Sequence, residues 1–320
     1  MTEPYYSYQN PAYLGIMRTD MMYFSASSPV YGIVTQNPIE DINFVSFSDT
    51  KSLAEFDVRL HAGYAFPFGE SFGMRVDVVE YNKMDRYWEG NYDYKSFGDS
   101  KNRWGIGSII DFGYKLKDNI SIGVGIGLFA GSTGNSGPIE PIENPEKAVF
   151  SANLGFLYRT LNESFIYDTR IGYSNETYDV IDDETLTVEK ETSVPIFWEN
   201  TFTFAYNERR TFFNLKQLND ICVDRVYYYG RVLPALEHFF VDWFSARLGI
   251  EGSFALLNDS PKLGYGFLAG ATFRIVKCHC DIDFNLTYRK RPSRVVEELL
   301  YPDFIVLLSL SWNDVFISRE

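Results

Sequence analysis

Strict alternation of apolar and polar residues in two stretches of the chain constrains its fold more than any other feature. In residues 245–254 and 281–289 one parity is apolar and the other carries charged and amide side chains. The apolar set is Ala246, Leu248, Ile250, Phe254, Ile282, Phe284, Leu286 and Tyr288, and the polar set is Arg247, Glu251, Asp281, Asp283, Asn285 and Arg289. A β-strand points successive side chains to opposite faces, so each stretch predicts a strand with one apolar and one polar face.

Composition separates the classes of protein that use such strands. The chain has 320 residues, of which 45% are hydrophobic and 17% aromatic, yet no stretch of about 18 apolar residues predicts a transmembrane helix. A transmembrane barrel produces this mixture, because only alternate residues meet lipid. The net charge of −14 argues against nucleic acid or anionic lipid as a partner.

The same alternation, bounded by turn residues, predicts about fourteen strands. They lie near 21–34, 53–66, 72–84, 103–116, 120–132, 149–160, 165–177, 194–206, 211–221, 226–239, 244–256, 263–275, 278–290 and 304–312. Short connections (67–71, 117–119, 161–164, 207–210, 241–243 and 276–277) alternate with longer ones (35–52, 85–102, 133–148, 178–193 and 291–303). Short turns at one rim and long loops at the other are typical of an outer-membrane barrel.

The strand count and the chain start leave alternatives open. The joints near 219–220 and 258–261 are short where a long loop is expected, and 42–48 is a further strand candidate, so twelve or sixteen strands are alternatives. No signal peptide is visible, and since a barrel must be exported we expect a mature chain. We predict an all-β transmembrane antiparallel barrel at 21–320, with residues 1–20 as a short plug segment in the lumen.

With the apolar parity facing lipid, the opposite parity lines the lumen. The predicted lumen wall includes Asp57, Arg59, His61, Arg75, Asp77, Arg247, Glu251, Arg274, Asp281 and Asp283. Acids and bases are nearly balanced, which favours cross-strand ion pairs over the alternative, a charged filter for a polar solute. Glycines on the lumen parity, such as Gly123 and Gly125, leave room for a plug or ligand and ease curvature.

Signals for catalysis and metal binding are absent. The chain has no Gly-x-Ser-x-Gly element, and its three histidines fall on separate strands, so we expect no enzyme and no cofactor. The alternative, a barrel hydrolase that uses His61 beside Asp57, lacks a motif. On a strand, Cys278 and Cys280 would point away from His279, so we expect no metal site there. The acidic residues at 179–191 lack EF-hand spacing and predict a solvated loop.

Three short motifs resemble a known superfamily of outer-membrane barrels. Asn10-Pro11-Ala12-Tyr13-Leu14-Gly15 resembles the Asn-Pro-Ala element near the mature N-terminus of FadL-type transporters. The hairpin at 62–73 resembles those of the same barrels and of the related PorV-type proteins. Residues 235–239 and 246–251 are similar to the Gly-x-Glu-Tyr and Ala-x-Arg-x-Gly-Tyr stretches of PorV-like members.

The resemblance implies a fourteen-stranded barrel with its lumen plugged by the N-terminal segment. FadL-type members take up long-chain fatty acids and other hydrophobic molecules, which leave sideways into the membrane. PorV-type members act instead as partners in protein secretion. The plug or gate residues that the resemblance implies are Asn10, Pro11, Ala12, Tyr13 and Leu14.

We therefore expect a channel for small hydrophobic molecules in the bacterial outer membrane. Its partners would be outer-membrane lipid, a hydrophobic solute and a possible protein at the extracellular loops. The loop aromatics Tyr87, Trp88, Tyr92, Tyr94 and Phe97 would form a capture surface, or else an interfacial girdle. The alternatives are a PorV-like structural or secretion partner and a general diffusion porin. The sequence does not identify the solute or the oligomeric state.

Overall fold

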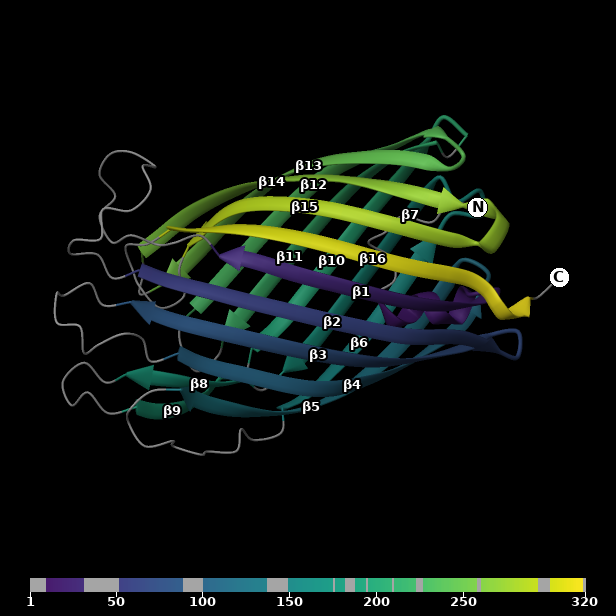
Figure 1. Ribbon diagram of the computed structural model, residues 1–320. Helices are drawn as coiled ribbons and strands as arrows, with labels where there is room; N and C mark the ends of the chain where they lie inside the picture. The colour runs from purple at the N-terminus through teal and green to yellow at the C-terminus, as the bar shows by residue number, and fades with distance from the viewer. Residues whose placement is uncertain are drawn as a thin grey trace.

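Fourteen antiparallel strands close into a barrel in the computed structural model, which confirms the predicted fold class and strand count (Figure 1). The structure describes residues 10–31, 52–88, 100–136, 149–174, 176–181, 188–193, 195–208, 210–222, 227–257, 260–292 and 300–318. The barrel strands are β1 (Thr19–Tyr31), β2 (Ser52–Phe68), β3 (Phe72–Trp88), β4 (Ser100–Lys117), β5 (Ile120–Ser136), β6 (Val149–Arg159), β7 (Phe165–Ser174), β10 (Pro195–Tyr206), β11 (Thr211–Cys222), β12 (Tyr227–Val241), β13 (Phe244–Leu257), β14 (Ser260–Ile275), β15 (Cys280–Pro292) and β16 (Leu300–Ser318). β7 pairs with β10, and β1 pairs with β16 to close the barrel.

A two-stranded hairpin outside the barrel corrects the sequence interpretation of one region. β7 ends at Ser174 rather than at residue 177, and β8 (Glu176–Ile181) pairs with β9 (Val188–Ser193) within the stretch that we had interpreted as a solvated loop. The β-branched residues Val180, Ile181 and Val188 favour strands despite their acidic neighbours. The extra strand candidate at 42–48 lies outside the described residues.

The barrel exposes apolar side chains on its outside and buries polar ones within. Leu154, Leu248 and Leu263 are 60%, 68% and 75% exposed, and they alternate with inward-facing neighbours. In contrast, Asp77, Asp111 and Arg247 are 1%, 1% and 2% exposed. A continuous apolar exterior is stable only against hydrocarbon, and a closed barrel leaves no strand edge unpaired there. Among the described residues, no helix is long and apolar enough to cross a membrane.

The two ends of the barrel differ. Short turns such as those at 69–71, 118–119 and 242–243 gather at one rim, together with the end of β16 (Figure 1). Rings pack along this rim, as in the stacked pair Phe68 and Phe72, and Trp243 at the β12–β13 turn is 55% exposed. Aromatic girdles border the lipid-facing band of outer-membrane barrels at both interfaces, and short turns mark the periplasmic side. The structure therefore places the chain in a bacterial outer membrane, as predicted.

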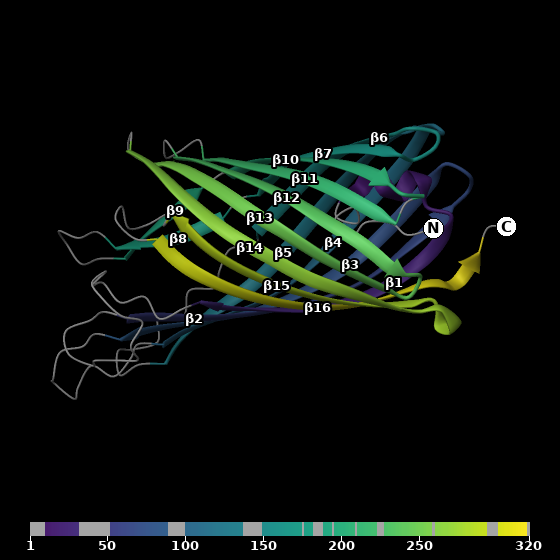
Figure 2. The same cartoon turned by 90° about the horizontal axis from the view of Figure 1, so that it is seen from above.

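One short helix lies inside the barrel near the periplasmic rim. The 3-10 helix η2 (Pro11–Ile16) precedes β1 and packs against the inner faces of β2 to β6. Figure 1 shows it as a purple coil within the barrel, and Figure 2 shows the tilted strands passing around it. Residues Pro11 to Gly15 are buried. The described part of the N-terminal segment, from Asn10 to Ile16, is thus turned into the lumen.

Candidate functional site

The helix η2 forms because its first residues satisfy their own backbone groups. Asn10 is the N-cap, and its side-chain oxygen accepts a hydrogen bond from the Ala12 N–H at 3.0 Å. Pro11 occupies the first helical position, where its missing N–H has no cost and its fixed φ suits the helix. The Asn-Pro-Ala element therefore encodes a compact capped turn.

A row of four glycines forms the seat for this turn. Gly73, Gly113, Gly123 and Gly155 face the lumen in register across β3, β4, β5 and β6. A methyl group on Gly73, Gly113 or Gly123 would overlap backbone atoms of η2, and one on Gly155 would overlap the Asn10 side chain. Only glycine permits so close an approach of helix to wall. The row fixes where η2 lies on the inner wall.

Polar and apolar contacts hold η2 on this seat. The Asn10 Nδ2 group lies 2.9 Å from the Thr169 carbonyl, 3.2 Å from the Phe156 carbonyl and 3.3 Å from Asp168 Oδ1. The Ser121 hydroxyl donates to the Ala12 carbonyl at 2.6 Å. Beside them, one buried apolar cluster contains Ala12, Tyr13, Leu157 and Ile166. The site thus combines bonds to backbone carbonyls with burial of an aromatic ring.

Charged side chains line the wall next to the seat. Arg75 Nε donates to Asp111 Oδ2 at 2.9 Å and lies 3.1 Å from Asp77 Oδ2. The Tyr23 hydroxyl donates to Asp77. Because each carboxylate has a cation or hydroxyl beside it, this cluster resembles a cross-strand brace rather than a filter of one charge.

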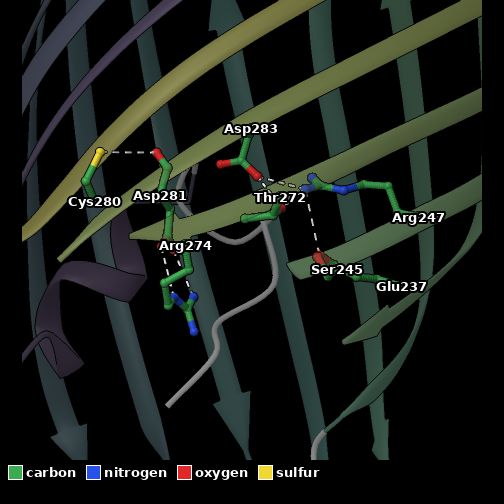
Figure 3. A network of polar contacts seen from close by, with 8 residues as sticks. All are labelled: Glu237, Ser245, Arg247, Thr272, Arg274, Cys280, Asp281 and Asp283. Carbon is green, nitrogen blue, oxygen red and sulfur yellow. Dashed lines mark hydrogen bonds and ion pairs between the residues drawn. The ribbon is translucent and has the colours of Figure 1, made fainter. Parts of the chain in front are cut away.

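A second network spans β12 to β15 on another part of the wall (Figure 3). Arg247 Nη2 donates to Asp283 Oδ1 at 2.7 Å and lies 3.7 Å from Glu237 Oε1. Gly270 lies opposite Arg247 in the strand register, where a Cβ would come within 3.0 Å of the Arg247 Cγ, so its lack of a side chain lets Arg247 cross β14. Ser245 donates to Glu237 at 2.7 Å. The network ties four strands together.

Two further ion pairs on the same side of the barrel involve predicted lumen residues. Arg274 and Asp281 form a two-pronged pair with N···O distances of 2.9 and 2.8 Å, and the Arg274 guanidinium lies 5.8 Å from the Phe239 ring centre. Glu251 lies 3.7 Å from Arg231, a partner that the sequence interpretation did not name. Charges of opposite sign therefore alternate along this wall.

Several predicted site residues fall outside what the structure describes. Asp57, Arg59 and His61 lie in β2, but their side chains are not among those described. Tyr87 and Trp88 end β3, with side chains likewise outside the described set. The other proposed capture residues, Tyr92, Tyr94 and Phe97, lie in a stretch outside the described residues. The capture surface stays a prediction.

The β12–β13 ladder is interrupted at its centre. Val232 pairs with Gly252 and Ala235 pairs with Gly249, but no pairing joins Leu233 or Pro234 to β13. The register is unchanged across the gap, so the cause is local: proline has no N–H to donate to the Ile250 carbonyl opposite. Sequence reasoning missed this position, although a proline inside an alternating stretch was the available signal.

A similar gap occurs in one other ladder of the described barrel that contains a proline. Between Ser27 and Val30 of β1 the pairing with β2 lapses at Pro29. That gap lies close to the long-loop end of β1, whereas the gap at Pro234 lies midway along β12. Pro29 and Pro234 therefore allow a ladder gap near a strand end to be compared with a gap midway along a strand.

An apolar pocket opens on the outer face at the Pro234 gap. Its volume is about 530 Å³. Its lining residues are Phe213, Pro234, Ala235, Leu236, Leu248, Gly249, Ile250, Phe267, Leu268, Ala269, Leu286 and Tyr288. The inner side of the wall at this level is the row Ala235, Gly249 and Leu268, which carries no charge. At the level of the Pro234 gap, the wall therefore presents apolar residues to the lumen as well as to the lipid.

The cysteine motif has a different geometry from the one predicted. β15 begins at Cys280 rather than at residue 278, and Cys278 ends the 3-10 helix η3 (Val276–Cys278). His279 has left-handed backbone angles of φ 50° and ψ 36°. The strand alternation that we used to exclude a shared metal therefore does not apply. Within the described part of the chain, no group of three or more His, Cys, Asp or Glu side chains is placed to hold a metal ion.

Solved structures with this architecture include toluene transporters and a FadL homologue. The Pseudomonas putida toluene transporter TodX matches with a TM-score of 0.63 and 12% identity, over 97% of this chain and 93% of that chain. A Pseudomonas aeruginosa FadL homologue matches with a TM-score of 0.62 and 11% identity, over 95% and 93%. The Ralstonia pickettii toluene transporter TbuX matches with a TM-score of 0.58 and 8% identity, over 95% and 92%.

These likenesses are structural. No protein-family model matches the chain, and no curated protein matches its sequence. At identities of 8–12% the agreement concerns the path of the backbone over nearly the whole length of each chain. The chain has the fold of FadL-type outer-membrane transporters, as the sequence resemblance predicted.

Proposed function

We propose that this protein is a non-enzymatic outer-membrane channel for compact hydrophobic molecules, which pass from the lumen into the bilayer between β12 and β13. One observation carries the proposal: the apolar pocket of about 530 Å³ lies where Pro234 interrupts the ladder. A missing ladder bond lowers the cost of separating the two strands there, because each intact bond inside hydrocarbon is expensive to break.

The chemistry of the wall supports the same route. At the level of the gap the lumen face consists of Ala235, Gly249 and Leu268. The next inner row toward the periplasm contains Glu237 and Arg247, and contact with an apolar solute is unfavourable there because it would desolvate their charges. A hydrophobic molecule in the lumen therefore binds most favourably to the apolar row beside the Pro234 gap. On the outer side of the same gap, Leu236 and Ile250 face the lipid.

The size of the pocket favours a compact solute over an extended one. A volume of about 530 Å³ lies within the range of small-molecule sites. The structural neighbours are described as a monoaromatic hydrocarbon channel and toluene transporters. We propose uncharged molecules of about this size as the substrate class, with long-chain fatty acids as the broader possibility.

The two ends of the route are proposed from the sequence. The aromatics Tyr87, Trp88, Tyr92, Tyr94 and Phe97 would concentrate the solute outside. Residues 1–20 would form the plug, with Asn10 to Leu14 closing the periplasmic side of the lumen. The seating of η2 on the glycine row supports this division into plug and barrel.

Uptake of a labelled monoaromatic hydrocarbon tests the proposal. We expect cells with the protein in their outer membrane to take up the label faster than cells without it. Pro234→Val restores the missing donor and should slow uptake several-fold. Pro29→Val repairs the comparable gap away from the pocket and should leave uptake unchanged. Equal uptake with and without the protein would contradict the proposal.

Two further measurements separate the alternatives. A diffusion porin would show steady ion conductance in a planar bilayer and uptake of sugars as well as hydrocarbons. A structural partner would show no solute flux and would instead co-purify in stoichiometric amount with another outer-membrane protein in mild detergent. Either result would replace the channel proposed here.

A further inference from the structure

The turn between β14 and β15 carries two cysteines on either side of one histidine. Cys278 ends η3 and is exposed, whereas Cys280 begins β15 and is only 4% exposed. The Cys278 thiol lies 3.6 Å from the Ile275 carbonyl oxygen, and the Cys280 thiol lies 4.0 Å from the Asp281 carbonyl oxygen. The third cysteine, Cys222, ends β11 at the opposite rim, so the first two form a local pair.

The backbone of the turn brings the pair together. In an extended strand the Cα atoms of residues i and i+2 lie about 6.6 Å apart, near the upper limit that a disulfide spans. His279 instead adopts left-handed angles, which residues other than glycine rarely do, and its N–H donates to the Val276 carbonyl at 3.4 Å. This turn shortens the separation of Cys278 and Cys280 below the strand value.

The turn lies in an oxidising compartment. It belongs to the rim that carries η2 and the short turns, which is the periplasmic rim of an outer-membrane barrel (Figure 1). Paired thiols that face the periplasm meet disulfide oxidants there. We propose that Cys278 and Cys280 form a reversible disulfide across His279, made by exchange with a disulfide-bearing periplasmic oxidant.

The exchange is balanced in atoms and electrons. The exposed Cys278 thiolate attacks one sulfur of the oxidant's disulfide and releases the other sulfur as a thiolate. The Cys280 thiolate then attacks the Cys278 sulfur and releases the second sulfur of the oxidant. Two thiols of this chain are oxidised to one disulfide, and the oxidant's disulfide is reduced to two thiols, which take up the two protons.

We expect this disulfide to respond to the redox conditions of the periplasm and to add little to the stability of the fold. The closed loop contains a single residue between the cysteines, so it restricts the unfolded chain very little. A bond in so tight a loop is also strained and easily reduced. The turn would therefore act as a redox-labile element on the periplasmic rim, independent of what the barrel transports.

Thiol counting on the full-length protein, exported to the outer membrane, tests the proposal. In a Cys222→Ser background, denatured and unreduced protein should accept no alkylating label, and it should accept two labels after reduction. Its mass should differ between the two states by two hydrogen atoms. Two labels without reduction would overturn the proposal. Cys278→Ser in the same background should accept one label in both states.

Substitution of the middle residue tests the role of the turn. His279→Gly keeps the left-handed conformation accessible and should leave the pair fully oxidised. His279→Val disfavours that conformation and should raise the reduced fraction at a fixed thiol–disulfide buffer by about tenfold. Equal oxidation of the two variants would show that the left-handed turn does not promote the bond.

Discussion

Two walls of the same barrel are built from the same alternation but differ in where small and rigid residues occur. In β3 to β6 the ladders run without a gap past four glycines in register, and these glycines receive the backbone of η2. In β12 and β13 a proline removes a ladder bond, and the outer face is hollowed there. Missing side chains on one wall create a binding seat, whereas a missing N–H on the other creates a weak point.

The comparison also concerns how each wall uses charge. Beside the glycine seat, Arg75 is held between Asp77 and Asp111. Beside the proline gap, Arg247 crosses Gly270 to reach Asp283, one inner row below the apolar surface. We interpret the second network as the support that keeps the barrel closed around its weak point. A substitution in one wall leaves the other wall unchanged, so the two can be tested separately.

The largest effect is expected from filling the glycine seat. Gly113→Val would place side-chain atoms in the space that the backbone of η2 occupies, so the helix could not keep its position against the wall. We expect the N-terminal segment to leave the lumen, so that planar bilayers change from no steady conductance to a persistent open level. Gly252→Val is the matched control, because open space surrounds that position. A silent bilayer with correctly folded Gly113→Val would show that η2 does not close the lumen.

The next largest effect concerns the buried ion network. Arg247→Met leaves the carboxylates of Glu237 and Asp283 without their cation, and it should lower the free energy of unfolding by ~3–5 kcal/mol. Urea unfolding in detergent micelles measures it. Arg210→Met removes an exposed periplasmic pair with Asp242 and should change stability by less than about 1 kcal/mol. Equal losses in the two variants would argue against a special role of the β12–β15 network.

The smallest effect is expected from filling the outer pocket. Ala269→Trp puts a large ring into the space beside Pro234 and should slow hydrocarbon uptake by roughly tenfold, equivalent to about 1.4 kcal/mol. Ala271→Trp, two residues along the same outward face of β14 but outside the pocket, should have little effect. The ratio of the two uptake rates is the measurement. A ratio near one would move the route away from this pocket.

The sequence was sufficient for the fold, because alternation and loop length are local signals repeated in every strand. The resemblance singled out Asn10 to Leu14, where the structure has a capped turn that adjacent residues encode, while their role as a gate stays a proposal. The sequence could not show that Gly73, Gly113, Gly123 and Gly155 form one row, since strand register is not written in any single segment. The position of Pro234 was readable in the sequence, but its meaning depends on the pocket across β13 and β14.

A reversible lock across the gap tests the central claim most directly. A Cβ at Gly249 would lie 3.0 Å from that of Ala235, so the two strands need to separate by only about half an ångström for Ala235→Cys with Gly249→Cys to form a disulfide beside Pro234. The test uses a background that lacks the natural cysteines, with Val124→Cys and Leu154→Cys on the other wall as control. We predict that oxidation stops hydrocarbon uptake only in the first pair and that reduction restores it. Undiminished uptake through the locked β12–β13 pair would contradict the account.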